Sequence, residues 1–406
     1  MFDQNQKIPS SWKKTTFGQV SEIIGGGTPR TDTPEYWNGE IPWLSVVDFN
    51  DGRHWVYGTE KTITNEGLAN SSTRLLNPGD LIVSARGTVG AFAQLKVPMA
   101  FNQSCYGLRA KKDSENNFLY YLLQQSIQQI KRNVHGAVFD TITRDTFDQI
   151  TVNVPPLSEQ QAISEVLLSL DNKIELLREQ NKTLEATAQT IFKEWFINFN
   201  FPGATGKMID SELGPIPNGW KVGKLGEIIT LFDSKRVPLA SDVRAKRLGR
   251  YPYYGATSIM DYIDDYLFDG TYLLLAEDGS VIDKEGYPIM QYVWGKFWVS
   301  NHSHVLQGKN GFSTEMLFVL LKKTNISGIV NGAVQLKINQ TNLINFKVLI
   351  PSSQALKQFD NILQPIFGKV KNIDLQIKTL SNIRDNLLPK LMKGEIRVKG
   401  FKQESL

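Results

Sequence analysis

The sequence has few residues that could bind a metal ion or form a disulfide. Its 406 residues include four histidines and one cysteine, Cys105. A single chain therefore cannot form an internal disulfide or a cysteine-based zinc site, and no histidine pair has the HExxH spacing of zinc peptidases. We expect no metal site and no disulfide, in a reducing, cytoplasmic compartment.

Long apolar segments are also missing. No run approaches the ~18 apolar residues that mark a helix spanning a bilayer. Residues 1–7 lack the apolar core of a signal peptide. We therefore expect no contact with a membrane.

The motifs of common catalytic sites are missing as well. There is no GxxxxGK[ST] phosphate loop and no GxSxG nucleophile turn. The Asn/Asp-Pro-Pro-aromatic motif of amino-methyltransferases is absent, since the single Pro-Pro pair, Pro155-Pro156, follows Val154. Residues 171–173, Asp-Asn-Lys, fit the D-x-K pattern of nucleases, but without an upstream Pro-Asp pair we interpret them as a solvated helix face. These absences favour a protein that is not an enzyme and has no catalytic residues.

The composition is that of a globular protein. Apolar residues make up 41% and charged residues 21%, which excludes disordered and fibrous chains. The length suggests two or three domains of about 150 residues each. With 45 Lys+Arg against 41 Asp+Glu, the net charge is only +4, which excludes a histone-like polycation but permits a local basic groove.

One half of the chain repeats the other. Three segments recur in the same order: Ile8–Lys13 as Ile216–Lys221, His135–Val138 as Asn331–Val334, and Val152–Pro155 as Val348–Pro351. The offset is 208 residues at the first segment and 196 at the other two, so the second copy is 208 − 196 = 12 residues shorter. Because the order is kept and the offset of 196 holds over a long stretch, a duplication explains the pattern better than shared composition does.

Each copy begins with a globular part. Leu81–Ser84 and Leu273–Ala276 have the composition of buried strands and end in glycine-containing loops. Short helices are expected at residues 117–132 and 314–323. The pattern predicts a mixed α/β domain dominated by strands.

Each copy ends in a long helix. From Leu167 onward, apolar residues recur at alternating spacings of three and four, which is typical of the a/d seam of a coiled coil. Arg384 departs from the seam, and Pro365 should kink the second helix or delay its start. The predicted seam residues are Leu170, Ile174, Leu177, Asn181, Leu184 and Ile191 in the first helix, and Val370, Ile373, Ile377, Leu380 and Leu387 in the second.

The two helices offer each other matching apolar surfaces. Because an apolar seam is unfavourable in water, we predict that they pair as an antiparallel coiled coil; the alternative is that each helix packs on its own domain. The fold class is then mixed α/β, with two globular domains in tandem, each followed by a long helix. The predicted boundaries are 1–155 for the first domain, 156–200 for its helix, 201–350 for a linker and the second domain, 351–398 for its helix, and 399–406 for a tail.

Polar residues in the globular domains are of types that bind nucleic acid. The loop from Gly25 to Arg30 could bring backbone N–H groups and a guanidinium to phosphates or base edges, while Asn and Gln suit bidentate contacts with adenine. Residues 235–250 form a basic stretch. Each of these residue types taken alone more often belongs to a turn or a solvated surface than to a DNA contact. The predicted DNA-binding set is Gly26, Thr28, Arg30, Arg86, Asn102, Gln103, Arg144, Lys235, Arg236, Lys246, Arg247, Arg250, Asn301, His302 and Lys337.

Short motifs occur in a fixed order along nearly the whole chain. They are Ile8-Pro9 with Trp12, Gly26–Pro29, Tyr36–Gly39, Pro155–Gln160, Leu213–Pro217, Tyr251–Ala256, Glu277–Gly279, Asn301–Leu306 and Leu387–Met392. Taken in this order, the motifs resemble the DNA specificity subunit of Type I restriction–modification systems. The second copy departs from the motif at Pro155–Gln160, since residues 350–355 read Ile-Pro-Ser-Ser-Gln-Ala.

The resemblance implies two target-recognition domains, each of which reads one half of a split DNA sequence. The paired helices would act as a spacer and as the docking surface for two methylation subunits, with Glu159 and Gln160 among the contacts. Restriction/translocase subunits would join them, and S-adenosylmethionine, ATP and Mg²⁺ would belong to the partners. Because the two domains differ in sequence, we expect an asymmetric bipartite target, at which the partners methylate adenine and restrict DNA.

Two other functions stay open. One is a nuclease or methyltransferase that acts alone and would turn over DNA without partners. The other is a scaffold whose helices bind protein and whose domains do not read DNA.

Overall fold

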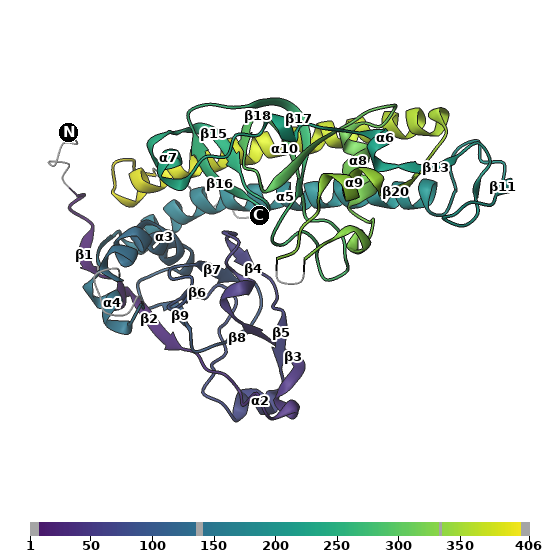
Figure 1. Ribbon diagram of the computed structural model, residues 1–406. Coiled ribbons are helices and arrows are strands. Elements are labelled where there is room, and N and C mark those ends of the chain that lie inside the picture. The colour runs from purple at the N-terminus through teal and green to yellow at the C-terminus, as the bar shows by residue number, and fades with distance from the viewer. Residues whose placement is uncertain (1–7, 135–140, 333–334, 399–406) are drawn as a thin grey trace. The chain divides into compact units, whose positions relative to one another are not determined.

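The computed structural model describes residues 8–134, 141–332 and 335–398 (Figure 1). The chain forms two compact units: unit 1 is Met1–Arg178 with Asp374–Leu406, and unit 2 is Glu179–Ile373. Each unit contains one globular domain and part of both long helices. The repeat segment His135–Val138, the end of Asn331–Val334 and the predicted tail 399–406 lie outside the described residues.

The described part of unit 1 contains a five-stranded sheet of order β2-β9-β6-β7-β4, a three-stranded sheet of order β5-β3-β8, and the pair β1-β10. The strand predicted at Leu81–Ser84 is confirmed as β6. The strands are β1 (Lys13–Thr16), β2 (Ser21–Gly25), β3 (Trp37–Leu44), β4 (Trp55–Val56), β5 (Lys61–Ile63), β6 (Leu81–Ser84), β7 (Phe92–Leu95), β8 (Ala100–Phe101), β9 (Cys105–Ala110) and β10 (Thr151–Val154). The helices are α1 (Phe17–Val20), η1 (Pro34–Tyr36), η2 (Val46–Asp48), α2 (Asn65–Ala69), α3 (Asn116–Val134) and α4 (Arg144–Gln149).

The described part of unit 2 contains a six-stranded sheet of order β14-β19-β17-β18-β15-β16 and the pairs β13-β20 and β11-β12. The strands are β11 (Met208–Ile209), β12 (Ile216–Pro217), β13 (Lys221–Lys224), β14 (Ile229–Leu231), β15 (Leu248–Tyr254), β16 (Ile259–Ile263), β17 (Phe268–Ala276), β18 (Met290–Val299), β19 (Ser303–Gly308) and β20 (Lys347–Ile350). The helices are α6 (Leu225–Ile228), η3 (Asp233–Lys235), α7 (Ser241–Lys246), α8 (Thr314–Leu321), η4 (Ser327–Ile329) and α9 (Gln340–Asn345).

Strand pairing confirms the duplication seen in the sequence. In unit 1, Lys13 of β1 faces Val154 of β10, and in unit 2, Lys221 of β13 faces Ile350 of β20. The two sequence offsets relate these pairs, since 13 + 208 = 221 and 154 + 196 = 350. The larger sheets agree, because β2-β9-β6-β7 and β14-β19-β17-β18 have the same antiparallel order.

The two long helices are α5 (Leu157–Phe196) and α10 (Ser353–Met392), each of 40 residues. At a rise of ~1.5 Å per residue, each is ~60 Å long. The predicted delay at Pro365 is wrong, because α10 begins twelve residues before it. Proline cannot donate a hydrogen bond to the preceding turn, but Leu363 and Phe367 beside it are buried in the core of unit 2, and this packing offsets the loss. None of the described helices is both long and apolar enough to cross a membrane.

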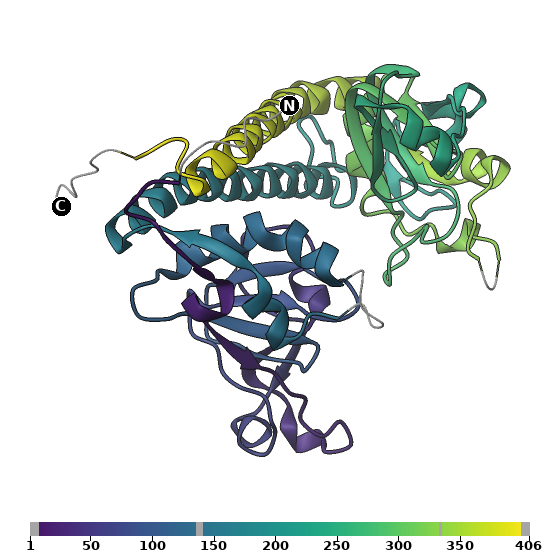
Figure 2. The same ribbon diagram turned by 90° about the vertical axis from the view of Figure 1, so that its left-hand side faces the viewer.

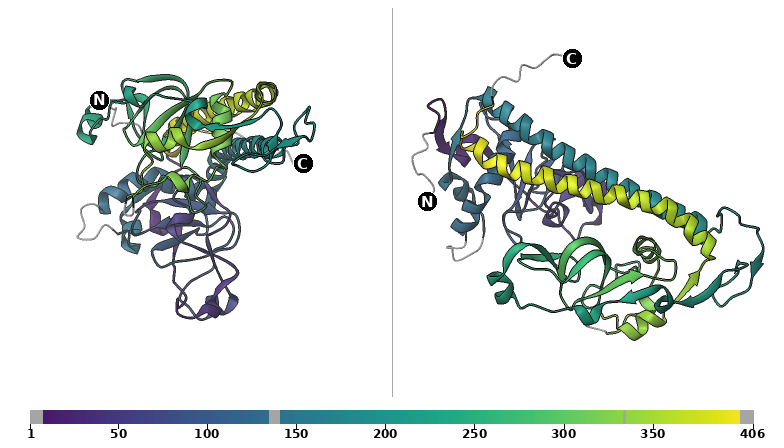
Figure 3. Two further views of the ribbon diagram at one scale, coloured as in Figure 1. Left: turned by 45° about the vertical axis from the view of Figure 1, so that its right-hand side comes forward. Right: turned by 90° about the horizontal axis from the view of Figure 1, so that it is seen from above.

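Within each unit, α5 and α10 lie side by side and run in opposite directions (Figures 2 and 3). In unit 1, Ile163 and Leu167 of α5 share a core with Leu388 near the end of α10. In unit 2, Phe192 near the end of α5 contacts Phe359 near the start of α10, with ring centroids 6.1 Å apart. Each helix also packs on a globular domain, so both arrangements weighed from the sequence occur together. Regular coiled-coil geometry stays a prediction.

The predicted seam residues all face away from solvent to some degree. Ile174, Leu177, Val370 and Ile373 are buried. The half-buried ones are Leu170, Asn181, Leu184, Ile191, Ile377, Leu380 and Leu387.

Candidate nucleic-acid interface

The loops of unit 1 that carry the predicted residues leave one end of its five-stranded sheet. β2 and β6 end there, and β7 and β9 begin there. The pairing register fixes this, because Gly25 faces Tyr106 and Ser84 faces Cys105. Loops that are far apart in the sequence therefore meet. We call this end edge 1 and define it by Thr28, Arg86, Asn102, Gln103 and Arg144.

Hydrogen bonds order the amide side chains of edge 1. The hydroxyl of Thr28 donates to the side-chain carbonyl of Gln103. The side-chain carbonyl of Asn102 accepts from the N–H of Ser104 at 3.1 Å. Each bond uses a side-chain oxygen, so the amide nitrogen of each residue keeps its donors for a ligand.

Backbone hydrogen bonds bring α4 to the same edge. Ala85 N–H donates to Ser104 O at 2.8 Å, and Ile142 N–H donates to Ala85 O at 3.0 Å. Arg144, the first residue of α4, has a guanidinium nitrogen 3.7 Å from the position that a Cβ on Gly25 would occupy. A residue that the sequence places far from the other loops is thus part of edge 1.

Arginines make edge 1 positive. Arg86 and Arg144 are exposed, and neither forms an ion pair with the described residues. Arg30, in the loop after β2, lies 3.3 Å from Asp32. The hydrogen bond from Arg30 holds the pKa of the Asp32 carboxyl below its usual value, so this pair is ionised and partly neutralised. Edge 1 therefore combines amide donors with guanidinium groups that suit phosphates and base edges.

The glycines of the loop after β2 serve packing. A Cβ on Gly26 would stand 2.1 Å from Asn102 O, and one on Gly27 would stand 2.4 Å from Thr73 N. The N–H of Gly27 already donates to Phe101 O at 3.0 Å. Gly26 therefore has a structural role, because only glycine lets the two loops approach this closely, and its contact with DNA stays a prediction.

Unit 2 has an equivalent edge. β14 and β17 end where β18 and β19 begin, because Leu231 faces Leu306 and Ala276 faces Ser303. We call it edge 2 and define it by Lys235, Asn301, His302 and Lys337. Lys235 and Asn301 are exposed.

Acidic residues accompany the cations of edge 2. His302 Nδ1 lies 2.8 Å from a carboxylate oxygen of Asp278, and the His302 side chain is 48% exposed. Lys337 Nζ lies 3.6 Å from a carboxylate oxygen of Glu277. Edge 2 therefore differs from edge 1, where two arginines have no acidic partner among the described residues.

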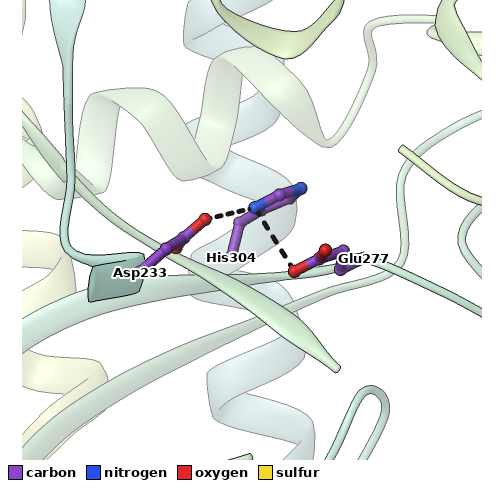
Figure 4. A group of neighbouring side chains, drawn as sticks. All are labelled: Asp233, Glu277 and His304. Atoms are coloured by element: carbon purple, nitrogen blue, oxygen red, sulfur yellow. Dashed lines mark hydrogen bonds and ion pairs between the residues drawn. The ribbon is translucent and has the colours of Figure 1, made fainter. Parts of the chain in front are cut away.

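A group of ionisable side chains lies next to edge 2: Asp233, Glu277 and His304 (Figure 4). His304 is fully buried; its Nε2 lies 2.8 Å from Ile338 O and its Nδ1 lies 2.6 Å from Asp233. Both ring nitrogens therefore face hydrogen-bond acceptors. Burial alone would raise the pKa of Asp233, but hydrogen bonds from His304 and the N–H of Val305 outweigh it and hold the pKa below its usual value.

Arg236 contacts this group. Its guanidinium donates to Glu277 at 2.6 Å and to Ser303 O at 2.7 Å, and its side chain is 13% exposed. Its binding to DNA stays a prediction, but these contacts leave it less available to a ligand than Arg86 or Arg144. The ligand atoms of Asp233, Glu277 and His304 lie within 4.8 Å of one another. They are already bonded to one another and to Arg236, so we interpret the group as structural.

The rest of the predicted basic stretch lies in α7 and at the start of β15. Arg247 lies 2.9 Å from Asp264 and 5.1 Å above the Trp298 ring, so its charge is partly neutralised. Arg250 is exposed. Lys246 is also exposed and forms no ion pair with the described residues. Of the three cations predicted here, Lys246 and Arg250 are the better candidates for phosphate contacts.

Comparison with known proteins identifies the family. A model of the Type I restriction modification DNA specificity domain matches residues 9–186 and 217–380. The chain belongs to this family. It is 29% identical to the MjaIX specificity subunit of a Type I restriction enzyme from Methanocaldococcus jannaschii, over 97% of this chain and 95% of the relative. It is 22% identical to the EcoprrI specificity subunit of Escherichia coli, over 86% of this chain and 87% of that one.

The fold agrees with the family. The Type I restriction–modification S subunit from M. genitalium has a TM-score of 0.52 to this chain at 17% identity, over 96% of this chain and 98% of that one. The predicted family and fold class are thereby confirmed: the chain has two specificity domains in tandem, mixed α/β in fold, with long helices.

Two residues expected to contact partner subunits serve the first specificity domain instead. Gln160 is fully buried, and its amide nitrogen donates to Asp113 O at 2.9 Å. That prediction is wrong for Gln160, because a side chain without exposed surface cannot form a docking surface. Glu159 accepts from the Trp12 indole at 3.2 Å and from Arg397 at 2.9 Å, so it too is engaged within unit 1.

A charged network on α5 is not predicted from the sequence. Asp171, interpreted as part of a solvated face, is 4% exposed. Its carboxylate accepts hydrogen bonds from His54 Nδ1, the Tyr121 hydroxyl and Arg384 Nη1, at 2.9, 2.6 and 2.7 Å. The solvated-face interpretation is therefore wrong. One sequence signal points to the network: Arg384 interrupts an apolar seam, and a cation in such a place needs an anionic partner.

Proposed function

We propose that this protein is the non-catalytic DNA-binding subunit of a Type I restriction–modification complex, in which each specificity domain reads one half of an asymmetric bipartite target. The observation that carries the proposal is the convergence of Thr28, Arg86, Gln103 and Arg144 at edge 1. Four separate segments of the chain supply these side chains. Their types suit base readout, because arginine forms two hydrogen bonds with guanine and glutamine or asparagine forms two with adenine.

Energetics favour two readers over one. A domain that reads about three base pairs at ~1–3 kcal/mol each supplies ~3–9 kcal/mol of discrimination. Specific binding requires ~4–10 kcal/mol over non-specific binding. One domain is therefore marginal, and two domains joined through α5 and α10 suffice.

The chemical difference between the two edges supports two half-sites with different base sequences. Edge 1 presents arginines that suit guanine. Edge 2 presents the carboxylate of Asp278, 21% exposed and held by His302, and a carboxylate suits the amino group of cytosine. An asymmetric target follows from this difference.

We further propose that α5 and α10 form the spacer and the docking surface for two methylation subunits, which restriction/translocase subunits join. Both helices carry large apolar side chains that the chain itself does not bury, such as Leu176, 52% exposed, and Leu375, 57% exposed. S-adenosylmethionine, ATP and Mg²⁺ would be bound by these partners, which would methylate adenine and restrict DNA.

The test is co-expression with the methylation partner, followed by mapping of modified adenines. We expect a split motif, altered in one half only by Arg86→Ala. Lys112→Ala is the matched control, because Lys112 is an exposed cation just after the opposite end of β9. A contiguous modified site would overturn the proposal of two readers, and an unaltered motif in the Arg86 variant would remove edge 1 from it. Turnover of DNA by the chain alone, with Mg²⁺ or methyl donor, would support an enzyme instead.

A further inference from the structure

A short segment of the first specificity domain docks on α5 through matched polar side chains. All of these residues belong to unit 1. Three consecutive residues each meet one side chain of the helix: Arg53 meets Glu175 at 3.9 Å, His54 meets Asp171 at 2.9 Å, and Trp55 meets Asn172 at 3.3 Å. The contact is therefore specific in register as well as in chemistry.

Hydrogen-bond acceptors face both ring nitrogens of His54. Gln94 uses its amide nitrogen on Gly79 O and Asn117 Oδ1, at 2.8 and 3.0 Å. Its oxygen therefore faces His54 Nε2, at 2.8 Å. Nδ1 faces the carboxylate of Asp171 at 2.9 Å, so both edges of the ring are fixed by hydrogen bonds.

Aromatic rings hold His54 in one orientation. The ring of His54 stacks on Tyr120 at 3.8 Å and on Trp55 at 4.4 Å, with interplanar angles of 17° and 26°. A ring stacked on two aromatic neighbours cannot tilt without losing these contacts.

Helix α10 reaches the same carboxylate. Arg384 donates to one oxygen of Asp171, while His54 and Tyr121 donate to the other. Burial alone would raise the pKa of Asp171, but these hydrogen bonds outweigh it and hold the pKa below its usual value. One carboxylate thus joins the specificity domain, α5 and α10.

Such a network fixes the orientation of the domain on α5 more than it strengthens the attachment of the domain to the helix. Buried ion pairs add little net stability over apolar packing, because desolvation offsets their attraction, but their hydrogen bonds are directional. The apolar core that contains Ile163 and Leu167 already attaches the domain to α5. Apolar contacts alone would tolerate small rotations of the domain on the helix surface, whereas three donors on one carboxylate tolerate few.

We propose that the His54–Asp171–Arg384 network fixes the angle at which the first specificity domain stands on the helices, and thereby the separation of half-sites that the protein accepts. This inference rests on the proposed function and deepens it. His54, Asp171 and Arg384 are positioning residues in this proposal, since they act through the domain that they hold on the helices.

Unit 2 holds its domain on α10 by the same chemistry. Glu315 of α8 is 6% exposed and accepts from the Tyr292 hydroxyl at 2.6 Å. Gln364 and Lys371 of α10 donate to its carboxylate, each at 3.2 Å. The same consequence for half-site separation is expected when this second carboxylate is neutralised.

The experiment measures modification of targets whose half-sites are separated by the native spacing or by one base pair more or fewer. One base pair shifts a half-site by ~3.4 Å along the axis and rotates it by ~35°. With the chain in complex with its methylation partner, Asp171→Asn and Glu315→Gln should each reduce the preference for the native spacing by ~10-fold, equivalent to ~1.4 kcal/mol. The bases preferred within each half-site should stay the same.

Leu167→Ala is the matched control. Leu167 is fully buried on α5, one turn from Asp171, so its truncation lowers stability without touching the network. We expect a lower melting temperature and an unchanged spacing preference. Equal relaxation of the spacing by Leu167→Ala would mean that the preference follows stability in general, and the positioning role would be wrong.

The remaining outcomes also decide the question. If folded Asp171→Asn and Glu315→Gln proteins keep the native preference, the proposal is wrong. If Asp171→Asn does not fold, Tyr121→Phe is tested in its place, because it removes one donor and no charge. A smaller relaxation of the spacing preference supports the proposal, and an unchanged spacing preference contradicts it. Failure of the proposed function is a separate result, since a contiguous site would already be seen with the unmodified chain.

Discussion

Cys105 lies at the start of β9 and is 1% exposed. Burial, with a smaller contribution from the charge of Asp48, raises the pKa of its thiol to about 12. Almost no thiolate exists at neutral pH, and the thiolate is the reactive form. We expect no alkylation of the folded protein by iodoacetamide at neutral pH and one adduct after denaturation, as measured by intact-mass spectrometry. Labelling of the folded protein would show that the core around Cys105 opens readily.

Asp171 makes stability depend on pH in the acid range. Its pKa is lowered from 3.8 in the folded chain, so its stabilisation is fully present above pH 3.8 and is lost as the pH falls through the lower folded value. We expect Asp171→Asn to destabilise the folded state by ~3–5 kcal/mol near neutral pH, because it removes the buried anion with which Arg384 pairs. The difference from wild type should shrink as the pH falls below 3.8.

Thermal melts over this pH range measure the effect. Asp51→Asn serves as the control, because Asp51 pairs with Arg53 in the same unit but its side chain is 55% exposed. Its loss should cost less than ~1 kcal/mol. A destabilisation by Asp171→Asn that persists undiminished in acid would mean that packing, and not charge, holds this site.

Contacts of single residues with partners far away in the sequence are the part that the sequence does not predict. Arg86 and Arg236 both lie in loops that follow strands, and the same role is expected for both from the sequence. Arg86 is exposed, whereas Arg236 is engaged by Glu277, 41 residues away. Only the tertiary fold places that carboxylate, so composition and spacing cannot separate the two arginines. The burial of Asp171 is not predicted for the same reason, because its partner His54 lies 117 residues away in the sequence.

At the scale of elements, local patterns predict well and special residues poorly. Apolar periodicity correctly predicts α5 and α10, because a long amphipathic stripe has few other ways to leave water. Pro365 is misjudged because its intrinsic effect is local, whereas Leu363 and Phe367 on the adjacent turns are buried by unit 2. Packing of one face can thus hold a helix through a residue that would end it in isolation.

The exposed apolar side chains of the long helices yield a prediction about partners. Leu176 and Leu375 are exposed in unit 1, so replacing them with arginine changes the surface without opening the core. We expect Leu176→Arg and Leu375→Arg to weaken co-purification with the methylation subunit by ~10-fold or more, since interface cores exclude unpaired charge. Melting temperatures should stay near the wild-type value.

Val47→Arg is the control, because Val47 is 68% exposed in unit 1 but lies outside the helices. It should co-purify normally. If all three variants bind the partner alike, the docking surface does not include this part of the helices.

For the molecule as a whole, the duplication separates what is shared from what is specific. The shared part is the scaffold, whose strand order and offsets follow from the sequence repeat. The specific part is the pair of edges, where Gln103 is set by Thr28 in one unit and His302 by Asp278 in the other. The scaffold can be predicted because many apolar positions of the sequence indicate the same fold. Each edge depends on a few side chains, and these come from loops that are far apart in the sequence.

Because edge 1 and edge 2 belong to different units, we predict that each half of the target is read independently. Gln103→Ala should relax base preference in one half of the target and Asn301→Ala in the other, each by ~1–3 kcal/mol at one position. The double variant should show both changes with additive costs, because the two residues belong to different units and different sheets. Thr28→Val should alter the same half as Gln103→Ala, and more weakly, because it removes only the bond that orients Gln103.

Mapping modified adenines for the four variants separates the outcomes. If Gln103→Ala and Asn301→Ala affected the same half, the assignment of one half-site to each domain would be wrong, whatever the motif itself proved to be. If Thr28→Val and Gln103→Ala altered different halves of the target, the residues of edge 1 would not read the same half-site. Because each variant is judged by the half it changes rather than by overall activity, a general loss of stability cannot produce the expected pattern.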